Sequence, residues 1–135
     1  MANEATIRSS LSILNSKLDY SSRPTSFQVD VSGEKGPTPG AIEVSIAGTD
    51  IDLSELTTPG LCRVMNLDDV DYIIYGIWDG TTFHELGEIG PGETYIVKLF
   101  RSIGSGIGTG YANLRLACGA GGSATVDAVV EAFER

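Results

Sequence analysis

The feature that most constrains the fold is a regular series of short β-rich runs between Leu61 and Arg101. These runs recur roughly every 8–12 residues, which is the spacing of an antiparallel sandwich or barrel. The pair Asp79-Gly80 is a strong hairpin signal, because both central residues of a type I′ turn need positive φ. The spacing predicts a meander, in which consecutive strands pair in turn, over residues 61–67, 72–78, 82–89 and 95–101.

Alternation of apolar and polar residues extends the β pattern to both sides of this block. It predicts further strands at residues 5–14, 17–20, 27–31, 41–47, 51–53, 111–118 and 125–133. The first and last of these also fit helical spacing, and their β-branched or Ser-rich composition favours strands. We therefore expect one all-β domain over residues 1–135, a jelly-roll-like antiparallel β-sandwich of about ten short strands with little or no helix. An N-terminal arm or strand would occupy about residues 1–20.

Composition and charge exclude several classes of function. A chain of 135 residues with 41% hydrophobic and 20% charged residues can bury one core. The formal net charge is −9 and the nine Lys and Arg residues are scattered. Nucleic acids and anionic lipids require clustered basic residues, so neither is an expected partner.

The sequence shows neither a signal peptide nor a membrane-spanning run. The N-terminal stretch has an early Glu4 and lacks a continuous apolar segment, and no run approaches the length that crosses a bilayer. Cys62 and Cys118 lie in apolar runs. Without a secretion signal, we expect both to be reduced core residues rather than a disulfide.

Two glycine-rich segments, residues 33–40 and 102–110, are predicted to be loops. Prolines in the first remove backbone donors, and the second lacks the Gly-Lys-Ser/Thr ending of a phosphate-binding loop. We interpret both as candidate contact loops for a protein partner. The candidate contact residues are Gly36, Pro37, Pro39, Ile103, Ile107 and Tyr111.

The polar residues do not form a catalytic pattern. His84 is the single histidine, and we interpret it as a half-exposed sheet or interface residue. Asp68, Asp69, Asp71 and Asp79 lack the spacing of an EF-hand, so we interpret them as turn residues rather than calcium ligands. We therefore expect no enzyme activity, no catalytic residues, no metal site and no cofactor.

Four aromatic residues surround the Asp79-Gly80 turn, namely Tyr72, Tyr75, Trp78 and Phe83. They could stack on sugar rings if they were exposed on one sheet face. Alternation divides them between two faces, so we favour core packing for at least part of the set. A carbohydrate-binding module stays open as an alternative.

The order of the turn and strand motifs resembles small β-sandwich structural proteins of tailed-bacteriophage virions. The motifs are PG-x-I-x-V at residues 39–44, TDIDL at 49–53, TPG at 58–60, MNLD at 65–68 and FHELGEIGPGE at 83–93. They are patterns of turns and strands and include no catalytic signature. The resemblance covers the chain from about Phe27 to its end.

This resemblance implies a virion structural protein, and above all a capsid decoration (cement) protein. Such a protein would dock in many copies on the major capsid protein shell and stabilise it. A head-tail connector, neck or tail component is the alternative. The resemblance also implies a homo-oligomer, with a trimer favoured, that is made in the host cytoplasm and placed on the capsid surface.

Overall fold

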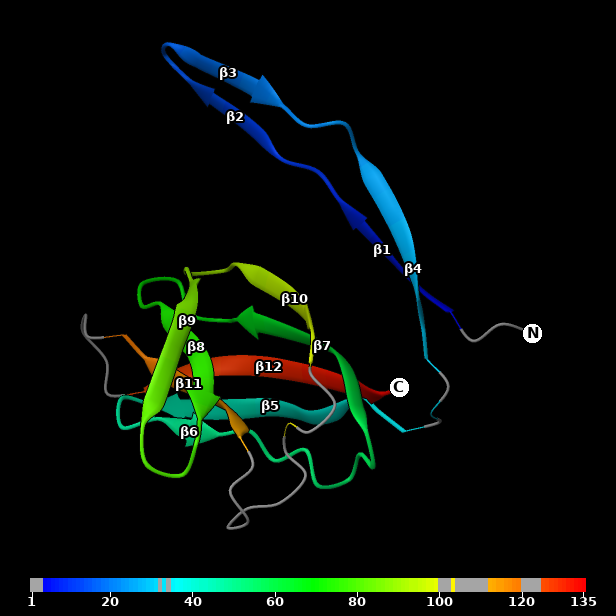
Figure 1. The fold of residues 1–135 in the computed structure, drawn as a ribbon. Coiled ribbons are helices and arrows are strands. Elements are labelled where there is room, and N and C mark those ends of the chain that lie inside the picture. Colours follow the sequence, from blue (N-terminus) through cyan, green and yellow to red (C-terminus); the bar gives the residue numbers. More distant parts are fainter. Residues whose placement is uncertain (1–3, 32, 34, 100–102, 104–111, 120–124) are drawn as a thin grey trace. The chain divides into compact units, whose positions relative to one another are not determined.

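The computed structural model describes residues 4–31, 33, 35–99, 103, 112–119 and 125–135. Within them the chain is all-β, with twelve strands in antiparallel sheets and no helix. This confirms the predicted fold class, including strands in place of the helical alternatives at both ends. The chain divides into two compact units, Met1–Ser32 and Gly33–Arg135, each of which is described by itself (Figure 1).

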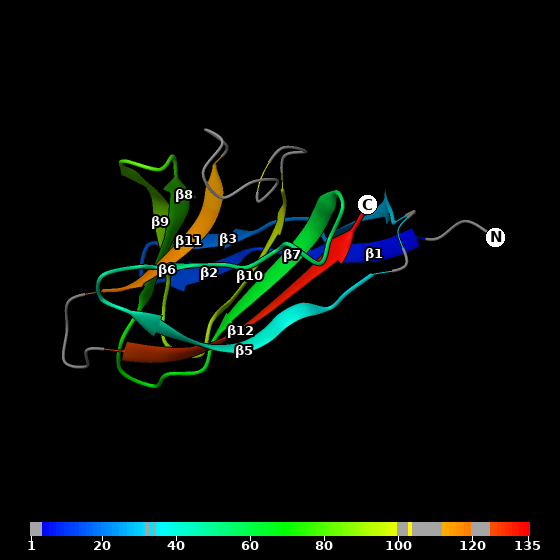
Figure 2. The same cartoon turned by 90° about the horizontal axis from the view of Figure 1, so that it is seen from below.

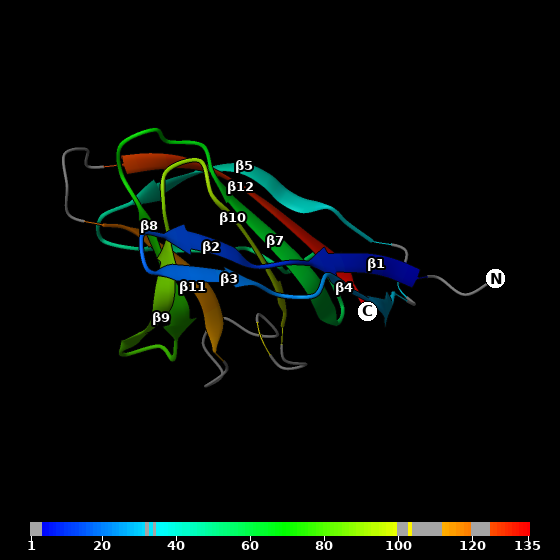
Figure 3. The ribbon, with the colours of Figure 1, turned by 90° about the horizontal axis from the view of Figure 1, so that it is seen from above.

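The first unit is a two-stranded ribbon built from four short strands. β1 (Glu4–Ser9) pairs with β4 (Thr25–Asp30), and β2 (Ser12–Asn15) pairs with β3 (Leu18–Ser21) (Figure 3). The strand expected at residues 5–14 is thus two strands, separated at Ser10 and Leu11. Leu11 stays connected to the opposite strand, because its carbonyl accepts from the Ser22 N–H and its own N–H donates to the Ser22 hydroxyl.

The second unit is a sandwich of two four-stranded sheets (Figure 2). One sheet has the order β10-β7-β12-β5 and the other the order β6-β11-β8-β9. Their bounds are β5 Thr38–Ser45, β6 Thr49–Asp50, β7 Pro59–Asn66, β8 Ile73–Trp78, β9 Phe83–Ile89, β10 Thr94–Lys98, β11 Asn113–Cys118 and β12 Thr125–Glu134.

The pairing of these eight strands is nested. β5 pairs with β12, β6 with β11, β7 with β10, and β8 with β9, as if one long hairpin had been rolled up. This is the double-sheet arrangement of a jelly roll. The jelly-roll-like sandwich expected from the sequence is therefore present in residues 33–135.

The predicted meander over residues 61–101 is wrong. β7 pairs with β10 and β12, and the chain crosses to the opposite sheet before β8, so only β8 and β9 form a hairpin. Alternation shows that a strand buries one face, but it does not identify the neighbouring strand. Packing of the two sheets decides the pairing.

Three local predictions also need correction. The β8–β9 connection is a loop over residues 79–82 with positive φ at Gly80 and not at Asp79, so it is not a type I′ turn. The strand expected at residues 51–53 is instead the short β6, and Ile51 and Leu53 are buried in the core. The loop expected at residues 33–40 ends earlier, because β5 begins at Thr38.

Pro39 can lie inside β5 because β5 is at the edge of its sheet. It stands opposite Glu131 of β12, and its missing N–H removes no ladder bond on the outer side. A proline therefore excludes a central strand but permits an edge strand.

The core lies between the two sheets. Its largest fully buried apolar side chains are Leu53, Ile73, Ile89, Ile103, Leu116, Val44, Val64, Val126 and Val130. Cys62 of β7 and Cys118 of β11 are buried thiols, as expected of reduced core residues, and the Cys118 thiol donates to the Gly119 carbonyl. Burial raises the pKa of the Cys62 thiol to about 12.

Candidate functional site

The N-terminal ribbon is amphipathic in its β1–β4 part. The register places Ala5 opposite Val29 and Ile7 opposite Phe27. Side chains of directly opposed residues lie on the same face, so these four share one face of the ribbon. The other face carries the pairs Thr6/Gln28 and Arg8/Ser26.

The β2–β3 tip continues this pattern. Ile13 stands opposite Tyr20 and shares a face with Leu18, whereas Leu14 stands opposite Asp19 on the other face. The tip turn includes Ser16 at a φ of 24°. Apolar side chains thus extend along the ribbon from its base to its tip.

Most of these apolar side chains are open to solvent. Leu14 is 85% exposed, Leu18 54%, Phe27 53% and Tyr20 50%. Ala5 and Ile7 are partly buried and Val29 is 6% exposed, so the open part of the apolar surface lies at Phe27 and the β2–β3 tip. The described residues of this unit pair into two strands and provide no second layer to cover them. A two-stranded hairpin alone is marginally stable in water, so a covering surface would stabilise the ribbon.

The ribbon is also electrically neutral. Residues 1–32 contain three basic and three acidic side chains, whereas residues 33–135 contain six basic and fifteen acidic ones. The formal charge of −9 therefore resides entirely on the sandwich unit. The part with the exposed apolar face is the part that a neighbouring surface can approach without net repulsion.

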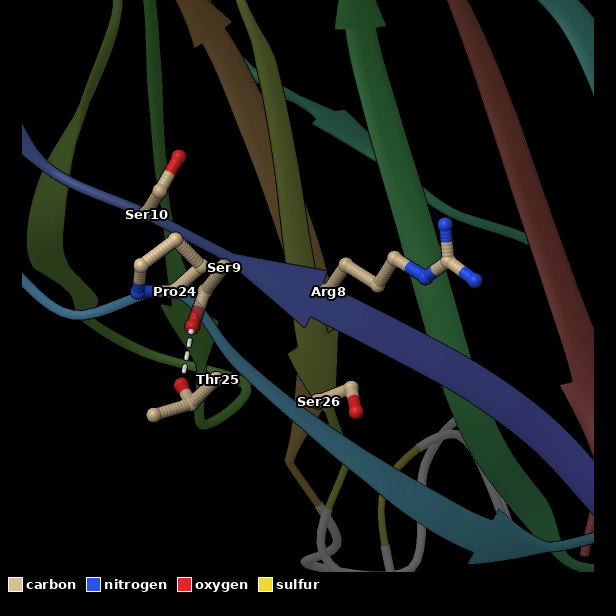
Figure 4. Close-up of a pocket in the computed structure, with 6 residues that line it drawn as sticks. All are labelled: Arg8, Ser9, Ser10, Pro24, Thr25 and Ser26. Carbon is tan, nitrogen blue, oxygen red and sulfur yellow. Dashed lines mark hydrogen bonds between the residues drawn. The ribbon is translucent and has the colours of Figure 1, made fainter.

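A shallow pocket lies on the ribbon where β1 ends and β4 begins (Figure 4). It is lined by Arg8, Ser9, Ser10, Pro24, Thr25 and Ser26. The hydroxyl oxygens of Ser9 and Thr25 are 3.1 Å apart, and Arg8 extends away from them. The Ser9 and Thr25 hydroxyls share the face of Ile7 and Phe27 and can bond to the polar groups of a protein surface there, whereas Arg8 and Ser26 lie on the other face.

The contact residues predicted from the sequence lie elsewhere. Gly36, Pro37 and Pro39 are exposed, as a contact would require. Ile103 is 1% exposed and belongs to the core, which counts against a contact through its side chain. Ile107 and Tyr111 lie outside the described residues.

The Asp68 carboxylate holds a turn. Asp68 Oδ1 accepts from the N–H groups of Val70 and Asp71, and these bonds lower the pKa of Asp68. In the part of the chain that the structure describes, no three His, Cys, Asp or Glu side chains come together as a metal site would require.

His84 is paired with the turn that precedes it. Its Nε2 lies 2.7 Å from Asp79 Oδ2, while Asp79 Oδ1 accepts from the N–H groups of Thr81 and Thr82. The His84 bond, followed by the two backbone bonds, lowers the pKa of Asp79 to about 2. This arrangement stabilises a hairpin loop.

Two of the four aromatic side chains are covered at least in part by other side chains. Tyr75 stacks on Tyr95 of the opposite sheet with ring centroids 4.6 Å apart, and both pack against the core. Arg115 lies 3.7 Å from the centroid of the Trp78 ring and is also bonded to Asp50, so it covers one indole face. Core packing is confirmed for Tyr75.

The sequence predicted contacts through two loops and an N-terminal arm, but it did not identify the apolar face of the ribbon as the exposed surface. The available signal was the alternation of Ile7, Leu11 and Ile13 beside a turn and a single return strand. Alternation implies a buried face, and a ribbon of two strands has nothing of its own with which to bury it.

These features define an acidic jelly-roll sandwich that carries an amphipathic N-terminal ribbon. Searches against protein-family models, curated proteins and solved structures found no match to this chain. Among the described residues there is also no helix with the length and apolar character needed to cross a membrane.

Proposed function

We propose that this protein is a virion structural component, a capsid decoration protein that docks in many copies on the shell and stabilises it. The observation that carries the proposal is the exposed apolar face of the ribbon. The resemblance of residues 39–93 to small sandwich proteins of tailed phages directs the proposal to virions. The partner is the major capsid protein or another virion protein.

Docking through the ribbon would supply the free energy that a two-stranded element lacks. Full burial of an exposed leucine or phenylalanine contributes about 1.5–3 kcal/mol, so covering the exposed half of Leu18 or Phe27 contributes about half of that. Several such side chains can therefore offset the entropy of ordering the ribbon on a surface. This entropy cost is limited, because backbone hydrogen bonds between the strands of the ribbon already restrict its conformations.

The division of charge fits the same role. The neutral ribbon meets the shell, while the acidic sandwich remains in solvent. Neighbouring sandwiches repel one another, so the copies stay apart unless a specific contact joins them.

A neck, connector or tail component would use the same docking surface. The two placements differ in where the protein lies on the particle, and electron microscopy of labelled particles distinguishes them. A symmetric homo-oligomer, with a trimer favoured, remains part of the proposal.

The direct test is to remove apolar side chains from the ribbon and measure binding to shells. Phe27→Ser combined with Tyr20→Ser should reduce co-sedimentation with particles strongly while the sandwich stays folded by circular dichroism. Leu86→Ser is the matched control, because Leu86 is 63% exposed but lies on β9. Deletion of residues 1–14 should likewise weaken docking more than folding.

Unchanged binding by the double variant would remove the ribbon from the mechanism. Equal loss with Leu86→Ser would show that any exposed apolar residue matters, and that the ribbon has no special role.

A further inference from the structure

The described strands of the sandwich include four edge strands, and each is a potential template for pairing with another chain. β5 and β10 are the edges of one sheet, and β6 and β9 are the edges of the other. Natural sheets protect such edges with charges, proline, bulges or very short strands. The four edges differ in this respect.

Three edges carry protection. β6 is two residues long. β5 contains Pro39 and Glu43, and β9 contains Glu85 and Glu88 and pairs with β8 through an irregular register at Tyr75/Gly76. Each of the three also bears at least one carboxylate, which repels a second acidic sandwich.

β10 has only one of these features, the charge of Lys98 at its end. Its five residues, Thr94–Lys98, contain no carboxylate, no proline and one cation, and they pair with β7 in an unbroken register. Ile96 at its centre is 45% exposed. In a unit with a net charge of −9, this is the edge that a second copy can approach with least repulsion.

We propose that β10 pairs antiparallel with β10 of a second copy of this chain, around a two-fold axis at Ile96. In this register Ile96 meets its own counterpart, and Lys98 stands opposite Thr94, next to Glu93, of the other copy. The Thr94/Lys98 and Tyr95/Val97 pairs on either side of Ile96 bring no like charges together across the contact. A strand that complements itself in this way makes an isologous interface.

The β10–β10 contact is expected to be weak because its interface is small. Two five-residue edges bury less than the roughly 1,000 Å² expected of a stable specific interface. Copies held side by side on a surface have a high effective concentration, so a weak contact suffices to link them. A two-fold contact does not close a ring of three, and it would therefore join trimers or other assemblies to one another.

The test is self-association of the full-length chain, measured by sedimentation equilibrium without particles. The native chain should form a dimer at high concentration. Ile96→Glu places two carboxylates face to face and should weaken dimerisation by about tenfold or more. Leu86→Glu adds the same charge at an exposed aliphatic residue of β9 and should change dimerisation by less than about twofold.

A mixture of two oppositely charged variants tests the β10 contact specifically. Chains with Ile96→Glu and chains with Ile96→Lys should each dimerise poorly, and mixing them should restore a dimer through opposite charges at the axis. Circular dichroism should show that both variants are folded.

Several results would overturn the proposal. The native chain could stay monomeric up to about 1 mM. Ile96→Glu and Leu86→Glu could weaken dimerisation equally, or the mixture of Ile96→Glu and Ile96→Lys chains could fail to form a dimer. Loss of the dimer in Phe27→Glu but not in Ile96→Glu would assign self-association to the ribbon. Particle binding is scored separately, so failure of shell docking would leave this result intact.

Discussion

Glu43 and Asp127 stand directly opposite each other in the β5–β12 pair, with both side chains on the exposed face of the sheet. Like charges at directly opposed positions of an antiparallel pair destabilise it. The sandwich therefore contains an electrostatic conflict that neither residue shows by itself in the sequence.

Replacing one of the two carboxylates should relieve this conflict. Glu43→Lys should raise the free energy of unfolding by about 0.5 kcal/mol, because a lysine opposite Asp127 turns repulsion into attraction. Urea unfolding measures the change. Glu88→Lys is the control, since Glu88 stands opposite Ile74 and changes the net charge equally. Equal stabilisation by both variants would attribute the gain to net charge alone.

The Asp79–His84 pair should be visible in an acid titration. The pKa of Asp79 in the folded protein is about 2, below its ordinary value of 3.8. The carboxylate therefore stabilises the hairpin above about pH 4, and this contribution disappears as the pH falls from 3.8 to about 2.

Removing the His84 side chain should shift the titration of Asp79 to higher pH. His84→Ala should raise the pKa of Asp79 towards its ordinary value, and the N–H groups of Thr81 and Thr82 should keep it somewhat below. Carboxyl ¹³C chemical shifts followed by NMR report the midpoint directly. An unchanged midpoint would mean that the backbone bonds alone hold the carboxylate ionised.

Asn66 should be among the most sensitive polar residues. It is 1% exposed, and its Nδ2 donates to the carbonyls of Asp71, Ile89 and Gly90, while its Oδ1 accepts from the Asp68 N–H. Asn66→Ala removes all four of these hydrogen bonds from a buried position and should lower the free energy of unfolding by about 2–3 kcal/mol.

Chemical denaturation provides the measurement for Asn66. Asn15→Ala at the exposed ribbon tip should change stability by less than about 0.5 kcal/mol. Similar small effects of both substitutions would mean that water replaces the Asn66 side chain.

The salt response of docking should be that of an apolar contact. Because the ribbon is neutral, binding to shells should stay unchanged or strengthen slightly up to physiological ionic strength, where the Debye length is about 8 Å. Added salt also reduces repulsion between neighbouring acidic sandwiches. Particle co-sedimentation over a salt series measures this, and stripping by moderate salt alone would show that docking is mainly electrostatic.

The sequence alone determined the class of structure. Period-2 alternation, as at Ile42, Val44 and Ile46, together with turn residues at short spacing, predicted an antiparallel sandwich without helix, and the structure confirms it. These signals are local. A few consecutive residues are enough to show which face of a strand is apolar and where a turn ends the strand.

The tertiary structure decided which strands are neighbours and which side chains remain exposed. Glu43 meets Asp127, and β7 meets β10 and β12, through pairings between residues far apart in the chain. Phe27 and Val44 both alternate with polar neighbours, yet Phe27 is half exposed and Val44 is fully buried. Alternation records only that a face is apolar, and whether a second layer covers it depends on packing between distant segments.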